Sequence, residues 1–123
     1  MNGVDFLVDS NVLINLVNGK PEAFDLLKSV NATPNRCAYS SVTRMEVLGW
    51  SGITEIQEQF ANRLLATMLH LPITHDVEDE TIALRRRRKV KLPDAIIAAT
   101  AACNGLQLLT LDQGLQSVVT EQH

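Results

Sequence analysis

Short runs of β-branched and leucine residues alternate along this chain with longer helical stretches, and this alternation limits the fold more than any other feature. The expected strands cover residues 4–8, 36–40, 69–73, 106–110 and, more weakly, 117–120. The expected helices cover residues 12–17, 21–30, 43–48, 54–68, 76–88 and 94–104. Strands joined through helices form right-handed crossovers. We therefore expect an α/β fold in three α/β/α layers, with a short, mainly parallel central sheet of four to five strands.

Composition and charge narrow the class of protein. The 123 residues fit one domain, spanning residues 1–123, and 46% hydrophobic residues is an ordinary globular content. The net charge of −3 argues against a protein that coats nucleic acid non-specifically. Six of the eleven basic residues nevertheless fall within residues 85–91. An acidic chain with one basic ridge suits a protein that grips nucleic acid briefly and does its chemistry elsewhere.

The two cysteines, Cys37 and Cys103, have no CxxC spacing and no histidine partners that would make a zinc site. We expect both to be small core residues. The sequence shows no signal peptide and no long apolar run. An intracellular, cytoplasmic protein in reducing surroundings, with no membrane contact, is therefore expected.

Two aspartates directly follow predicted strands. Asp9 ends the first strand and Asp112 follows the fourth, so both carboxylates are expected at the edge of a parallel sheet where reactive groups collect. Each also has a plain structural explanation. Asp9 would cap the helix that follows it, and Asp112 would bond to its own backbone in the turn before Gly114.

Two further acids lie on predicted helices. Asp94 starts an apolar helix that should be buried, so its carboxylate would lose hydration unless a positive group compensates. The helix dipole offers ~0.3–1 kcal/mol. A divalent cation offers more, and we favour it. Glu46 fits a capping box with Thr43 as the N-cap, although it also lies at the edge of the predicted core.

Four carboxylates without histidine or thiolate partners make a hard oxygen site, which suits Mg²⁺ or Mn²⁺ better than zinc. The candidate metal ligands and catalytic residues are therefore Asp9, Glu46, Asp94 and Asp112. Such a site can activate water, orient a phosphate and shield charge during hydrolysis of a phosphodiester.

In these stretches the chain resembles the PIN-domain nucleases, and among them the VapC-type toxins of bacterial toxin–antitoxin pairs. The resemblance covers essentially the whole chain and rests on residues 6–14, 40–48, 91–101 and 108–112. It implies a PIN-like fold and a metal-dependent endoribonuclease whose metal-binding quartet is formed by the same four acids. One departure is visible. Gln113, Gly114 and Leu115 follow Asp112, where many relatives carry further polar residues and a phenylalanine.

The same resemblance implies supporting residues and partners. Asn11 and Thr110 would be polar supports for the ligating carboxylates, which such ligands generally need. The implied partners are an RNA substrate, a second copy of the chain in a homodimer, and a small VapB-like antitoxin that masks the site.

The basic run has several interpretations. It ends a helix whose start is acidic, a polarity that the helix dipole favours in a solvated helix. Its members are also candidates for binding RNA phosphate or an acidic antitoxin tail: Arg85, Arg86, Arg87 and Arg88.

Other functions fit less well. A haloacid-dehalogenase-type phosphatase also begins with a strand ended by aspartate, but Asn11 stands where its general acid would lie. The chain has no glycine-rich phosphate loop of a nucleotide-binding protein. A non-catalytic PIN-like module that binds RNA or protein is the alternative, and metal titration separates it from a nuclease.

Overall fold

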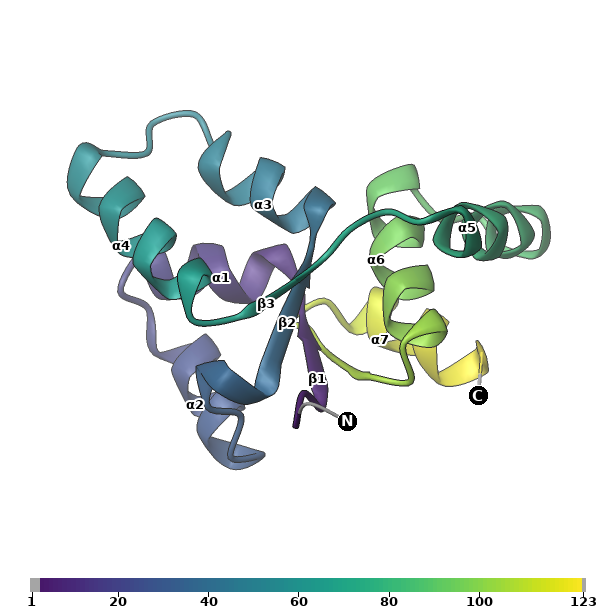
Figure 1. Ribbon diagram of the computed structural model, residues 1–123, viewed down its shortest axis with the longest axis horizontal. Coiled ribbons are helices and arrows are strands. Elements are labelled where there is room, and N and C mark those ends of the chain that lie inside the picture. Colours follow the sequence, from purple (N-terminus) through teal and green to yellow (C-terminus); the bar gives the residue numbers. More distant parts are fainter. Residues whose placement is uncertain (1–2, 123) are drawn as a thin grey trace.

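A parallel four-stranded sheet forms the centre of the protein (Figure 1). The computed structural model describes residues 3–122, with side chains as far as residue 119. The strands lie in the order β3-β2-β1-β4, and each neighbouring pair is parallel. Their bounds are Phe6–Val8 for β1, Cys37–Ser40 for β2, Leu69–Leu71 for β3 and Gln107–Leu109 for β4.

Helices cover both faces of this sheet, with α1 to α4 on one side and α5 to α7 on the other (Figure 1). The α-helices within residues 3–122 are α1 (Ser10–Val17), α2 (Pro21–Ser29), α3 (Ser41–Leu48), α4 (Glu55–Ala66), α5 (His75–Arg87), α6 (Leu92–Cys103) and α7 (Gln113–Gln122), and Pro34–Arg36 forms a short 3₁₀ helix. The predicted three-layer α/β architecture with a parallel sheet is confirmed. No helix in this described part of the chain has the length and apolarity needed to cross a bilayer.

Strand β1 lies at the centre of the sheet and is buried on both faces. Phe6 and Val8 belong to the hydrophobic cluster under α1 and α4, whereas Leu7 belongs to the cluster under α6 and α7. Side chains alternate in direction along a strand, so each core receives every second residue. This explains why the strand is a continuous apolar run, as is typical of parallel sheets covered on both faces.

Helix α6 packs between the sheet and α5 (Figure 1). Four of its alanines, Ala95, Ala98, Ala99 and Ala101, are fully buried. Their small side chains let the backbone of α6 approach its neighbours on several sides at once. The position of Asp94 at the start of this helix is therefore fixed by dense packing.

One predicted element is wrong. Residues 117–120 were expected to form a short fifth strand, but they lie inside α7. Leu115, Val118 and Val119 are buried against the α6 side of the core. Their spacing of three and four residues is that of one helix face, and this tertiary burial outweighs the β-propensity of two adjacent valines. The other predicted elements are present, with ends within two residues of those expected.

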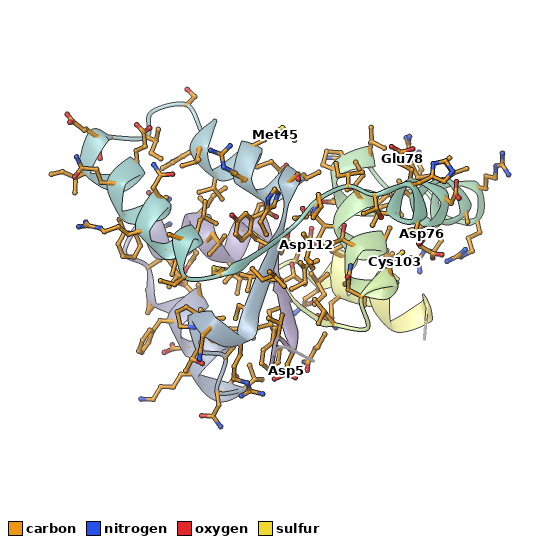
Figure 2. The ribbon with its side chains drawn as sticks, viewed as in Figure 1. Asp5, Met45, Asp76, Glu78, Cys103 and Asp112 are labelled. Atoms are coloured by element: carbon orange, nitrogen blue, oxygen red, sulfur yellow. The ribbon has the colours of Figure 1, made fainter. Side chains whose placement is uncertain are left out.

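The two cysteines differ in their surroundings. Cys37 is buried, as expected, and burial raises the pKa of its thiol to about 11. Cys103 is exposed at the end of α6, where its thiol contacts the backbone oxygen of Asp76 at 3.6 Å (Figure 2). The expectation that Cys103 is a core residue is therefore wrong. It falls on the outer face of the last helical turn.

The packing of α6 gives a test of the fold. Replacing Ala98 by leucine should destabilise the protein by about 1–3 kcal/mol, because a fully buried alanine leaves no space for extra methylene groups. Urea unfolding measures the change. The control is Ala83→Leu on the exposed face of α5, which should stay within about 0.5 kcal/mol of the parent. Equal stability of the Ala98→Leu variant would contradict the close packing of α6.

Candidate active site

The carboxylate of Asp9 lies at the carboxyl end of β1 and is only 4% exposed. Its backbone N–H donates to the carbonyl of Leu109 at 2.9 Å, so the ladder between β1 and β4 continues to this residue. One carboxylate oxygen accepts a hydrogen bond from the backbone N–H of Ser10 at 2.7 Å, and Asp9 is the N-cap of α1. The capping role expected for this residue is confirmed.

Thr110 ties the ends of β1 and β4 together. Its hydroxyl donates to the second carboxylate oxygen of Asp9 at 2.7 Å. The hydroxyl oxygen itself accepts from the side-chain amide of Asn11 at 3.2 Å and from the backbone N–H of Asp112 at 3.0 Å. One donor and two acceptor positions are all that a hydroxyl offers, so this group is fully used.

Asn11 also links the start of α1 to the segment after β4. Its side-chain oxygen accepts from the backbone N–H of Leu111 at 3.1 Å, while its amide nitrogen donates to Thr110. The segment after β4 is thereby held against the start of α1. Both residues that the family resemblance offers as polar supports thus touch the acids or their connecting backbone.

Glu46 reaches the site from α3. The hydroxyl of Ser10 donates to a carboxylate oxygen of Glu46 and lies 3.1 Å from the hydroxyl of Thr43. A serine hydroxyl has one hydrogen, so Thr43 is the donor in the second contact. Thr43 is fully buried, so this chain of contacts fixes Glu46 from inside the protein.

The capping box expected at Thr43 and Glu46 is wrong. Helix α3 begins at Ser41, and its N-cap is Ser40, whose side chain accepts from the backbone N–H of Thr43 at 3.2 Å. Glu46 therefore lies well inside the helix, one turn after Thr43. Ser10 and Thr43 are the residues that sequence reasoning missed. Their signal was position, since one follows Asp9 directly and the other precedes Glu46 by three residues.

The other two acids lie at helix starts. Asp94 is half-buried in the first turn of α6, behind the N-cap Lys91. Asp112 is exposed, and one of its oxygens accepts from the backbone N–H groups of Gly114 at 2.9 Å and Leu115 at 3.3 Å. The turn role expected for Asp112 is confirmed. Figure 2 shows it between the sheet and α6, away from Asp76 and Glu78 on the outer helix α5.

One open cavity of about 410 Å³ joins these residues. Its lining contains all four predicted acids together with Ser10, Asn11 and Ile14. The acids come from the end of β1, from α3, from the start of α6 and from the turn after β4, so more than one hundred residues separate the first from the last. The cavity lies at the carboxyl ends of β1 and β4, where the strand order reverses and open parallel sheets place their ligands.

The pKa values of two carboxylates in the cavity, those of Asp9 and Asp94, are raised. The pKa of Asp9 is raised mainly by burial and further by the charges of Asp94 and Glu46, against the lowering effect of its hydrogen bonds from Thr110 and Ser10. The pKa of Asp94 is raised by burial, then by Asp112 and Glu46, while Lys91 lowers it. Bringing these negative charges together in the cavity therefore costs free energy. A bound cation would remove that cost.

The four acids share one cavity, but their side chains are not close enough together to enclose a metal ion. Within residues 3–122, no three acidic, histidine or cysteine side chains converge closely enough to hold one. The donor set nevertheless fits a hard cation, because the cavity offers carboxylate, hydroxyl and amide oxygens and neither thiolate nor imidazole.

The arginine run lies outside this cavity. Arg85, Arg86 and Arg87 are exposed in the last turn of α5, and Arg87 lies 3.6 Å from Glu80. Arg88 ends the helix and lines a neighbouring cavity that shares Asp94 and Asp112 with the first. Lys89 and Lys91, which the sequence-based set of substrate-binding residues omits, line that neighbouring cavity too.

The fold and the site together define a class of protein: a parallel α/β domain with acids at the switch point of its sheet. The PIN domain model matches residues 6–120, and the chain belongs to the PIN-domain family. No curated protein matches the chain.

Solved structures give the same picture. A chain of a toxin–antitoxin complex from Klebsiella pneumoniae is 38% identical, with a TM-score of 0.76 over 89% of this chain and 88% of that one. VapBC2 from Rickettsia felis, bound to a promoter DNA fragment, is 14% identical, with a TM-score of 0.75 over 94% and 93%. The sarcin–ricin-loop-cleaving toxin VapC20 of Mycobacterium tuberculosis is 16% identical, with a TM-score of 0.69 over 92% and 94%. The structural neighbours are thus VapC-type toxins and their complexes.

The electrostatic repulsion among the carboxylates is expected to lower the stability of the folded protein. Because the pKa of Asp94 is raised in the folded protein, its ionised form disfavours folding at neutral pH. Asp94→Asn should therefore raise the melting temperature of the metal-free protein at pH 7 by a few degrees. The gain should shrink as the pH falls through the raised pKa and vanish below the ordinary value of 3.8. Differential scanning calorimetry over a pH series measures it.

Added Mg²⁺ provides the control. It should stabilise the parent and not the Asp94→Asn variant, because a ligand that binds only the folded state raises stability by mass action. A variant less stable than the metal-free parent at pH 7 would mean that the favourable helix-dipole interaction of Asp94 outweighs the repulsion.

Proposed function

We propose that this protein is the toxin of a VapBC-type toxin–antitoxin pair and hydrolyses RNA phosphodiester bonds with the help of Mg²⁺ or Mn²⁺. The observation that carries the proposal is the single cavity lined by Asp9, Glu46, Asp94 and Asp112. Membership of the PIN-domain family and the similarity to toxin–antitoxin chains support it. Residues 1–123 would act as one PIN domain in the cytoplasm, where cellular RNA is the substrate.

The donor atoms suit a divalent cation held between the four acids, with Asp9 and Asp94 as the principal ligands. When bound, such a cation supplies an activated water and neutralises charge on the phosphate. Each oxygen of Asp9 accepts one hydrogen bond from the protein and keeps another lone pair for a ligand. Thr110 and Ser10 thus orient this carboxylate without occupying it.

Glu46 and Asp112 would complete the site or position the attacking water. Glu46 is oriented by the Ser10 hydroxyl, and Asp112 by the two backbone N–H groups of α7. Three of the four carboxylates, those of Asp9, Glu46 and Asp112, are thus each oriented by hydrogen bonds from different neighbours. Such support of ligands by surrounding hydrogen bonds is general for metal sites.

The antitoxin has a suitable docking surface on the opposite side of α1. An apolar cavity of about 460 Å³ is lined by Leu16, Leu27 and Leu64 together with the exposed rings of Phe24 and Phe60. Solved neighbours are toxin–antitoxin complexes, so we assign this groove to an apolar segment of the antitoxin. We further propose that the chain acts as a homodimer, which its molar mass in solution tests.

Cleavage of a mixed single-stranded RNA tests the activity. Purified protein should cut it with Mg²⁺ or Mn²⁺ and not with EDTA, and Asp9→Asn should abolish cutting by at least about a hundredfold while leaving the fold intact. Gel electrophoresis of the products and circular dichroism of the variant measure both. If the folded, antitoxin-free protein bound no metal ion and cut no RNA tested, including structured transfer and ribosomal RNA, the non-catalytic PIN-like module would be favoured.

The hydrogen bonds of Thr110 give a second test. Thr110→Val keeps the shape of the side chain but removes the donor to Asp9 and the acceptor for Asn11 and Asp112. Mg²⁺ affinity or cleavage should fall by about 10–100-fold, as for other supports of metal ligands. Thr33→Val, at an exposed position that does not line the acid cavity, is the control and should change neither. An unchanged Thr110→Val variant would remove this residue from the site.

A further inference from the structure

A second cavity, of about 370 Å³, adjoins the acid-lined one. It shares Asp94 and Asp112 with that site, and its lining also includes Arg88, Lys89 and Lys91. The two cavities thus meet at a pair of carboxylates. The second cavity thus combines three positive groups with two of the four acids.

The connection between α5 and α6 presents these cations. The backbone is extended at Arg88 (φ −142°, ψ 149°) and at Lys91 (φ −64°, ψ 148°). Val90 packs against the core between α6 and α7, and its carbonyl accepts from Nε of Arg85 at 3.3 Å. Lys89 and Lys91 flank this anchored residue and are exposed. An anchored backbone therefore holds two ammonium groups at the edge of the acid site.

The rest of the basic run is engaged elsewhere. Arg85 supports the connection through Val90, and Arg87 lies near Glu80. Arg86 lines an outer cavity that contains Ile82 and Leu92 and no carboxylate, a cavity that Arg88 and Lys89 also reach. Lys91 lines only the cavity on the acid side. The end of α5 therefore separates the arginines on the helix, residues 85–87, from the basic residues that follow it.

Binding of RNA at this site requires positive groups beside the acids. Four carboxylates repel RNA, and a bound cation offsets only part of their charge. A strand whose cleaved phosphodiester lies at the acids must place a neighbouring phosphate beside them, and lysine binds phosphate as a point charge. Lys91 lies three residues before Asp94, and both line this second cavity, so the lysine stands at the border of the site.

We propose, resting on the proposed nuclease function, that Lys89 and Lys91, together with Arg88, bind a backbone phosphate of the RNA adjacent to the phosphodiester that is cut. Residues 85–87 do not contact the strand in this arrangement. RNA is favoured over an acidic peptide, because its next phosphate continues into the cation-binding acids, whereas a peptide carboxylate gains no such second contact.

Two matched double variants test this assignment. Lys89→Gln with Lys91→Gln removes two charges from the acid side, and Arg86→Gln with Arg87→Gln removes two from the outer side. All four side chains are exposed, so both variants should keep the fold, which circular dichroism checks. Both are made in the Asp9→Asn background, so that RNA is bound but not cut. Fluorescence anisotropy of a labelled mixed-sequence single-stranded RNA, with Mg²⁺ and over a salt series, gives the dissociation constants.

The lysine variant should bind RNA about tenfold more weakly at low salt, and the slope of log Kd against log salt should fall by about 0.7 for each phosphate that the protein no longer neutralises. The arginine variant should match the Asp9→Asn parent. Equal decreases in affinity for both variants, or a decrease for the arginine variant alone, would overturn the proposal. So would a lysine variant that binds a deca-glutamate peptide more weakly while its RNA binding is unchanged.

Failure of the underlying function gives a different result. If the Asp9→Asn protein bound no RNA and the parent cut none, the proposed nuclease would fail and this inference with it. If the parent cut RNA but the lysine variant bound it normally, only the phosphate site would be wrong.

Discussion

Burial of the Asp9 carboxylate at the end of the central strand costs free energy, and the surrounding polar structure is arranged to offset that cost. The Thr110 hydroxyl and the Ser10 N–H each satisfy one oxygen, and the same Thr110 hydroxyl holds Asn11 and the backbone of Asp112. Strands β1 and β4, the start of α1 and the turn before α7 therefore converge on one carboxylate. Removing a single partner would leave buried polar groups unsatisfied, which is expensive in a low-dielectric interior.

The structural roles of the acids and the functional roles proposed for them coincide in this site. Asp9 caps α1, and Asp112 orders the start of α7. A carboxylate at a helix start is stabilised by backbone N–H groups and the helix dipole, so it can be held near other negative charges. The fold thus tolerates a concentration of charge that raises the pKa of Asp9 and Asp94. A plain structural explanation for an acid is therefore no argument against a functional one.

The sequence alone predicts the order of strands and helices and the four acids, because both depend on local patterns and on the rule that parallel strands end at one edge. It does not predict how α3 begins. Thr43 and Glu46 match a capping box, yet Ser40 caps the helix, and Thr43 turns inward to Ser10 through a contact between residues 33 positions apart. Likewise, Val118 and Val119 resemble a strand locally, and only packing against α6 shows that they belong to a helix. The division of the basic run depends on which cavity each side chain lines, and this follows from tertiary packing and not from local sequence patterns.

In the proposed site, one cation joins four acids from four parts of the chain. Manganese broadening of backbone amide signals in NMR spectra of the ¹⁵N-labelled protein tests it most directly. Small amounts of Mn²⁺ should broaden the amides near Asp9, Glu46, Asp94 and Asp112 together, at one common concentration. Broadening centred on the acidic start of α5, around Asp76 and Glu78, with those four regions unaffected, would contradict it.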